Sequence, residues 1–161
     1  MTNERLEIMA LTDNINMLTP IGFRLTINAT EFANVEYFCT SVSLPSLSLS
    51  PIPIPFRNRQ GVMSGDSIEY GQFSMTFVVD EEMKNYLEIF NWMERNAHQG
   101  VETKDATLSI LSNQNTTNKQ IQFLEAIPSQ LNELEFNTQT SAVEYLTCSV
   151  TLEYDRFKFV T

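Results

Sequence analysis

The chain has 161 residues, a mass of 18.4 kDa and 42% hydrophobic residues, which suffices for one domain with a packed core and argues against disorder. Ten basic residues stand against 20 acidic ones, and this net charge of −10 argues against nucleic acid as a bound ligand, since Lys and Arg supply phosphate contacts. No apolar run approaches the roughly 20 residues that span a bilayer, and the N-terminus shows no secretory pattern, so we expect a cytoplasmic protein without membrane contact.

The chain begins with an N-terminal segment, 1–20, that precedes the first predicted strand. Residues 21–28 then alternate between apolar and polar side chains, and residues 35–42 form a second alternating run. Alternation with a period of two is typical of a half-buried strand. We therefore predict that the two runs form a hairpin across the region 28–34.

Residues 44–66 contain four of the six prolines of the chain. Proline has no amide donor and a restricted φ, so this segment can lie beside a sheet or across a neighbouring molecule but cannot form an interior strand. Its apolar residues recur at every second position, and leaving them in water is costly. We expect an extended inter-subunit arm, with contacts made by Leu47, Leu49, Ile52, Ile54, Phe56, Arg57, Asn58 and Arg59.

After the arm, a strand is predicted over 67–79, with a bulge near Gly71 that would bring Ile68 and Tyr70 to the buried face. A helix is predicted over 80–99, with Asp80 as its N-cap and apolar residues at spacings of three and four. Such a helix packs over a sheet of its own chain or lies between subunits. The side chains expected to pack are Met83, Leu87, Phe90 and Trp92.

Two further strands, 106–112 and 119–126, flank a polar stretch that favours a turn, which predicts a second hairpin. The last strand, 142–154, places Cys148, Val150 and Leu152 on one face. Its other face is too polar for a core and too poor in Lys and Glu for an ordinary solvent face, so we expect it to line a wide aqueous channel. This candidate lumen face consists of Tyr145, Thr147, Ser149, Thr151 and Glu153, with Arg24, Thr26 and Asn28 as a second set.

The sequence shows no arrangement of residues that would indicate catalysis. His98 is the only histidine, and the five glycines are scattered, so neither a histidine-rich metal site nor a phosphate loop is expected. Cys39 and Cys148 lie in alternating runs, where a free cysteine behaves as a small hydrophobe. We therefore expect a protein that is not an enzyme and that has no cofactor and no metal.

Several short motifs occur in a fixed order along the chain. They are Phe38-x-x-x-Val42-x-Leu44-Pro45, Ile54-x-Phe56-x-Asn58-Arg59, Gly65-Asp66, Asp80-Glu81 and a helix that carries Trp92. From about Gly22 to Tyr154 the chain resembles the tail tube proteins of T4-type contractile phages, whose relatives include pyocin tubes and the Hcp protein of type VI secretion. The resemblance is most specific from Leu44 to Asp66, where the spacing matches, and it is one of pattern only in the C-terminal half.

The resemblance implies a mainly β fold with one α-helix, an antiparallel β-sandwich or half-barrel with a long extended arm, over residues 1–161 as a single domain. It also implies six-membered rings that stack into the inner tube of a tail, contact sheath and baseplate proteins, and let DNA pass without specific binding. The location implied is the virion tail, after assembly in the host cytoplasm. Pro51, Pro53 and Pro55 depart from the main tube protein. The chain is therefore a main tube subunit or a tube-initiator, baseplate or terminator paralogue.

Two other functions are compatible with the residues alone. A monomeric β-sandwich binding module, with the proline arm as ligand for an aromatic groove, would have the same composition. A small hydrolase would need a base, for which the single histidine or a carboxylate would have to serve. Rings or filaments in the electron microscope would distinguish the tube from both.

Overall fold

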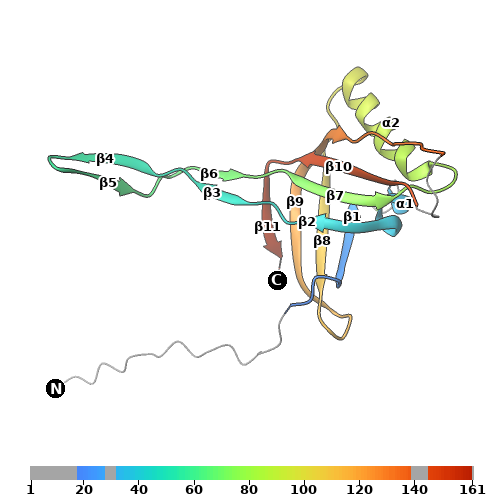
Figure 1. The fold of residues 1–161 in the computed structure, drawn as a ribbon, viewed down its shortest axis with the longest axis horizontal. Coiled ribbons are helices and arrows are strands. Elements are labelled where there is room, and N and C mark those ends of the chain that lie inside the picture. Colours follow the sequence, from blue (N-terminus) through green and yellow to red (C-terminus); the bar gives the residue numbers. More distant parts are fainter. Residues whose placement is uncertain (1–17, 28–31, 139–144, 161) are drawn as a thin grey trace.

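The computed structural model describes residues 18–27, 32–138 and 145–160, and shows a β-rich body from which a long two-stranded arm projects (Figure 1). The strands pair antiparallel throughout the described residues, and a helix covers one flank of the body. The expected fold class, mainly β with a flanking helix and an extended arm, is confirmed.

The body consists of two sheets that share one long strand. In the first sheet β1 pairs with β8, β8 with β9, and β9 with β11. In the second sheet the order is β9, β10, β7 and β2. The strand bounds are β1 Phe23–Ile27, β2 Cys39–Ser43, β7 Phe73–Val78, β8 Lys104–Leu111, β9 Thr117–Leu131, β10 Thr147–Glu153 and β11 Arg156–Val160.

β9 passes from one sheet to the other at Glu125. This residue has a φ of 54°, which is uncommon for a side chain other than glycine, and its amide donates to Asp105 Oδ1 at 3.1 Å. The bend lets the two sheets face each other across one core. That core is formed by alternating residues of the strands together with both helices, and its largest fully buried side chains are Trp92, Phe32, Phe73, Phe77 and Phe123.

The predicted hairpin of 21–28 with 35–42 is wrong. Residues Ala33–Phe38 form a short helix, α1, and β2 begins only at Cys39. β1 pairs with β8 and β2 with β7, so the two runs belong to different sheets. The physical reason is the spacing of Phe32 and Val35, both buried, which suits one side of a helix better than a strand.

The predicted bulge near Gly71 was expected to bring Ile68 and Tyr70 to the buried face, and this expectation is wrong. The chain leaves the sheet at this point, so that Ile68 in β6 (Ile68–Tyr70) stays exposed, whereas β7 starts at Phe73 on the core side.

The predicted hairpin of 106–112 and 119–126 is confirmed, since β8 pairs with β9 on either side of the polar turn.

The long helix α2 covers Lys84–His98, so it begins four residues after the expected N-cap. Asp80 does not cap it. The residue at the N-cap position is Met83, with a φ of 55°, and no side chain caps the helix there. The buried Asn85 instead fastens the first turn to the preceding strand, because its Nδ2 donates to Val78 O at 2.6 Å and its Oδ1 accepts from the amide of Tyr86 at 2.9 Å.

Candidate assembly surfaces

The outer side of the second sheet carries hydroxyl groups on three neighbouring strands, interrupted by Val78 opposite Thr147. Cross-strand partners share a face, and in the register Ser149 lies opposite Thr76, which in turn lies opposite Ser41 of β2. Thr76 Oγ1 and Ser149 Oγ are 2.9 Å apart, within hydrogen-bond distance. We call this surface the hydroxyl face, and it consists of Ser41, Ser43, Ser74, Thr76, Thr147, Ser149 and Thr151.

The hydroxyl face lies opposite the core, since the alternate residues of β10, Cys148, Val150 and Leu152, are fully buried. Of the candidate lumen residues, Thr147, Ser149 and Thr151 lie within this face. Glu153 stands at its margin, where its carboxylate accepts a hydrogen bond from the Gln72 side chain. None of these positions is packed in the core, which is the arrangement that would have excluded a channel lining.

The remaining candidates for the lumen lie elsewhere. Tyr145 precedes β10 and is 78% exposed. Arg24 and Thr26 belong to β1 in the first sheet, away from the hydroxyl face, and Asn28 lies outside the described residues. Sequence reasoning missed the serines of β2, because Ser41 falls in the run 35–42 predicted as part of a hairpin and Ser43 lies just beyond that run. Their alternation with Val42 was the available signal.

The second sheet has an open edge on each side. At one side β2 pairs only with β7 among the described strands, and at the other the last part of β9, residues 127–131, pairs only with β10. Unpaired backbone groups on an edge strand readily pair with another chain. Both edges of this sheet are thus available for pairing with a further strand.

The arm is a ribbon of two successive antiparallel pairs, β3 with β6 near the body and β4 with β5 at the far end (Figure 1). Its remaining strand bounds are β3 Leu47–Leu49, β4 Ile52–Phe56 and β5 Arg59–Met63. From Leu47 to Phe56 it extends about 30 Å at the usual rise per residue. The expected contact residues Leu47, Leu49, Ile52, Phe56, Arg57, Asn58 and Arg59 are exposed, and Ile54 is half-buried.

The tip of the arm is tightly built. The Phe56 ring lies over Gly61, where an added Cβ would come within 2.3 Å of the ring. The Arg59 guanidinium lies over the same ring, 5.2 Å from its centroid, at a distance typical of a cation–π contact. Gly61 is therefore required for the close approach that holds the aromatic ring and the cation together.

The root of the arm is fastened to the body by aromatic residues. Tyr154 Oη donates to the Gly71 carbonyl at 2.6 Å, and the rings of Tyr70 and Phe157 meet edge-on at 5.4 Å. Burial raises the pKa of Tyr154 to about 12, and the charge of Glu153 adds to this effect. These contacts fix the position of the arm where it joins the body.

Helix α2 has two apolar sides. Ile89 and Trp92 are fully buried, and the Trp92 ring packs on Phe32 at 5.1 Å between centroids. Leu87 and Phe90 are each 46% exposed. Of the four side chains expected to pack, the structure therefore places Trp92 in the core, Met83 half-buried before the helix, and the other two at the surface.

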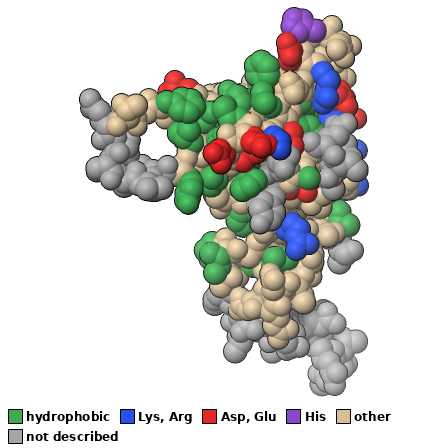
Figure 2. All heavy atoms as spheres, turned by 90° about the vertical axis from the view of Figure 1, so that its right-hand side faces the viewer, with side chains coloured by type: hydrophobic (Ala, Val, Ile, Leu, Met, Phe, Trp, Pro, Cys, Tyr) green, Lys and Arg blue, Asp and Glu red, His purple; other side chains and the backbone are tan. Residues whose placement is uncertain are grey.

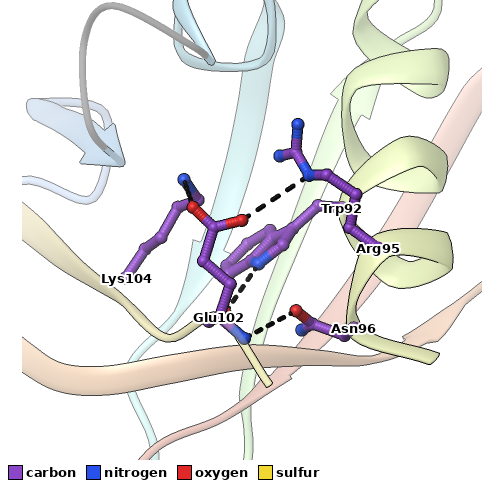
Figure 3. Close-up of polar contacts among 5 residues, drawn as sticks. All are labelled: Trp92, Arg95, Asn96, Glu102 and Lys104. Atoms are coloured by element: carbon purple, nitrogen blue, oxygen red, sulfur yellow. Dashed lines mark hydrogen bonds and ion pairs between the residues drawn. The ribbon is translucent and has the colours of Figure 1, made fainter. Parts of the chain in front are cut away.

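A polar cluster fastens the C-terminal end of α2 to β8 (Figure 3). The Trp92 indole donates to the Glu102 carbonyl at 2.9 Å, and the Glu102 amide donates to Asn96 Oδ1 at 2.9 Å. The Glu102 carboxylate meets Lys104 Nζ at 2.8 Å and Arg95 Nε at 3.5 Å, and the hydrogen bond from Lys104 lowers its pKa. The cluster holds α2 in a fixed position on the body.

The described part of the chain offers little for metal binding or for a membrane. It holds no group of three or more His, Cys, Asp or Glu placed to bind a metal, and none of its helices is long and apolar enough to cross a membrane. A cavity of about 420 Å³ lies between β1 and α1. Its carboxylate, Glu36, accepts a hydrogen bond from the Ile27 amide at 2.6 Å, and burial raises the pKa of Glu36.

The sequence is similar to those of known tail tube proteins. The family model described as T4-like virus tail tube protein gp19 matches residues 56–158. The tail tube terminator protein of Enterobacteria phage T4 is 28% identical over 130 residues, covering 73% of this chain and 74% of that protein.

Solved structures share the fold. A chain of the PVC sheath–tube complex, from an extracellular contractile injection system, matches with a TM-score of 0.72 at 18% identity, over 91% of this chain and 93% of that chain. A chain of the tube-terminating cap of the anti-feeding prophage matches with a TM-score of 0.72 at 21% identity, over 95% and 99%. Hcp1 from Flavobacterium johnsoniae matches with a TM-score of 0.55 at 18% identity, over 85% and 93%. Because the family model covers more than half of the sequence, this chain belongs to the T4-like virus tail tube protein family, whose members are structural proteins of tails.

Proposed function

We propose that this chain assembles into rings of six copies that form part of the inner tube of a contractile phage tail. The observation that carries the proposal is the hydroxyl face on a sheet with two open edges. Pairing β2 of one copy with the end of β9 in the next would join the sheets into one closed barrel and leave no free edge.

In such a barrel the hydroxyl face would line the channel. Ser and Thr side chains are well hydrated and carry no charge, so they give phosphate groups no cation to bind. The net charge of −10 has the same consequence for DNA that passes through. The ring would thus guide DNA without holding it, and sheath and baseplate proteins would be its partners in the virion, after assembly in the host cytoplasm.

For the position within the tail, we favour the end of the tube. The phage T4 relative at 28% identity is a tail tube terminator, and a chain of the anti-feeding prophage cap shares the fold. A terminator forms rings that stop growth, whereas a main tube subunit forms long stacks. The main tube subunit is the second candidate, supported by the family model itself.

Negative-stain microscopy with light scattering of the purified protein tests both levels. Rings with six-fold averages are expected, as single rings or short stacks for a terminator and as long tubes for a main subunit. A protein that stays monomeric at high concentration would contradict the ring and favour the monomeric binding module.

Whether the hydroxyl face lines the channel of the ring can be tested separately. Thr151→Arg would place a cation on the face in every subunit, so the rings should retain DNA at low salt and release it at high salt. Thr117→Arg, at the exposed start of β9 near the polar turn, is the matched control. Equal retention by both variants would contradict a channel lined by this face.

A further inference from the structure

The arm tip, Phe56 to Arg59, differs in charge from the rest of the molecule. Segment 51–63 contains two arginines and no carboxylate, whereas the whole chain has twice as many acidic as basic residues. Phe56 is 52% exposed and carries the Arg59 guanidinium on its ring. Aromatic residues and arginine are both enriched in protein interfaces.

The prolines of β4 determine how the arm can bind. In an antiparallel pair, residues alternate between pairs that exchange two backbone hydrogen bonds and pairs that exchange none. Pro53 and Pro55 lie opposite Val62 and Gln60 and have no N–H, so theirs are pairs of the second kind and their nitrogen atoms face outward. The β4 edge of the arm therefore lacks N–H donors at Pro53 and Pro55 and is a poor template for a further strand, which favours contacts through side chains on this edge.

A surface of complementary character lies on α2. Leu87 and Phe90 are half-exposed there, and the exposed Glu94 follows Phe90 by one helical turn. Glu81 and Glu82 are exposed just before the helix. We call Leu87, Phe90 and Glu94 the α2 surface; it is apolar at its centre and acidic beside it.

The arm and α2 lie on opposite sides of the body (Figure 1). Figure 2 looks onto the side away from the arm and shows hydrophobic side chains with acidic side chains among them. Complementary patches on opposite sides of one molecule meet when copies associate head to tail, which is the geometry of a ring or a stack.

We propose that the arm tip of one copy docks on the α2 surface of another copy, with Phe56 against Leu87 and Phe90 and the arginines beside Glu94. This inference rests on the proposed ring function and names the partner surface of the arm. It explains why α2 keeps two large apolar side chains exposed although its opposite side is fully buried.

Photo-cross-linking in the full chain tests the docking site. Phe56 is replaced by p-benzoylphenylalanine, and isotopically light and heavy proteins are mixed before assembly so that adducts between copies are recognised. Mixed adducts within residues 84–98 are expected. A probe at Gln60, on the opposite face of the ribbon, should give such adducts at least fivefold less often.

The outcomes separate the docking site from the ring. Assembled particles whose adducts lie elsewhere, or that give no adduct, overturn the docking site and leave the ring intact. A probe at Phe90 gives the reciprocal test, since it should reach residues 52–63, and adducts to another α2 would overturn the proposal. If no particles form, the ring function fails and the docking site with it.

Charge reversal supplies a second readout that does not depend on a probe. Arg59→Glu and Glu94→Arg should each raise the protein concentration needed for assembly by roughly tenfold, and the double variant should recover most of the loss. The matched control combines Glu94→Arg with Arg24→Glu, a reversal on the exposed part of β1. Equal recovery in the control would overturn the pairing.

Discussion

The body and the arm use the same kinds of side chain in opposite ways. In the body, Phe73, Phe77 and Phe123 are completely buried between two sheets, whereas in the arm Phe56 and Met63 are 52% and 57% exposed. The difference follows from the number of layers, because a two-stranded ribbon has no second layer to cover its faces. Apolar side chains therefore form a core in one region and remain exposed in the other, where we propose that they contact another copy.

The two regions also differ in what stabilises them. The body is stabilised by burial, whereas the arm is held by the hydrogen bonds between its strands and by the hydrogen bond from Tyr154 to the Gly71 carbonyl. An isolated hairpin is marginally stable in water. Substitutions in the body should thus lower the free energy of unfolding, and substitutions in the arm should lower assembly.

The largest effect is expected for Trp92→Ala. Removing this fully buried side chain leaves a cavity beside Phe32 and removes the hydrogen bond to Glu102, so unfolding should become easier by about 3–5 kcal/mol. Urea unfolding followed by circular dichroism measures it. The control is Leu87→Ala on the exposed side of the same helix, for which a loss below about 1 kcal/mol is expected; equal losses would contradict the two-sided helix.

A smaller effect is expected for Tyr154→Phe. The variant leaves the Gly71 carbonyl without its donor at the root of the arm, at a cost of about 1–2 kcal/mol. Trypsin should also cleave the arm faster at Arg57 or Arg59. Tyr145→Phe, at an exposed tyrosine, should change neither quantity.

The same tyrosine should make stability depend on pH in the alkaline range. Its pKa is raised to about 12, so between pH 10 and 12 the unfolded chain releases the phenol proton while the folded chain retains it, and the free energy of unfolding falls as pH rises. The pKa of Cys39 is raised to about 11 by burial, which adds a fall of the same sign above pH 9. Tyr154→Phe should remove the tyrosine's share of this fall, between about pH 10 and 12, and leave the share of Cys39 between about pH 9 and 11. An unchanged profile would contradict this assignment.

The smallest effect on the folded monomer is expected for Phe56→Ala. The side chain is half-exposed, so the free energy of unfolding should change by less than about 0.5 kcal/mol, whereas assembly should fall strongly. Unfolding curves and light scattering on the same samples measure both. Gln60→Ala, on the other face of the ribbon, serves as control. Unchanged assembly would contradict the proposal that the arm acts in assembly while the body determines the stability of the monomer.

Much of the fold was predictable where the pattern is local. The strand with Cys148, Val150 and Leu152 on its buried face and the β8–β9 hairpin match the structure, because alternation and a polar turn act over a few residues. The start of α2 was not predictable, because Asn85 holds the first turn through contacts that depend on the end of β7. Asp80 looked like the better cap by residue type alone.

The candidate site divides in the same way. The row Thr147, Ser149 and Thr151 was visible in one strand, and its neighbours Ser41 and Ser43 were not, because their run was assigned to a hairpin with β1. Only the strand order places the hydroxyl side chains of β10, β7 and β2 on one face of the sheet. The exposure of Phe90 was likewise undecided until the packing of α2 was known.

By itself the sequence determined the periodicities, the proline-rich extended arm, the family motifs and the excess of acid, since each depends on neighbours in the chain or on composition. The tertiary structure alone decided that β2 pairs with β7, that residues 33–38 are helical, and which side of α2 is buried. These depend on contacts between residues far apart in the sequence. Side-chain periodicity specifies which face of a strand is apolar, but the choice of partner strand is made by the packing of the whole body.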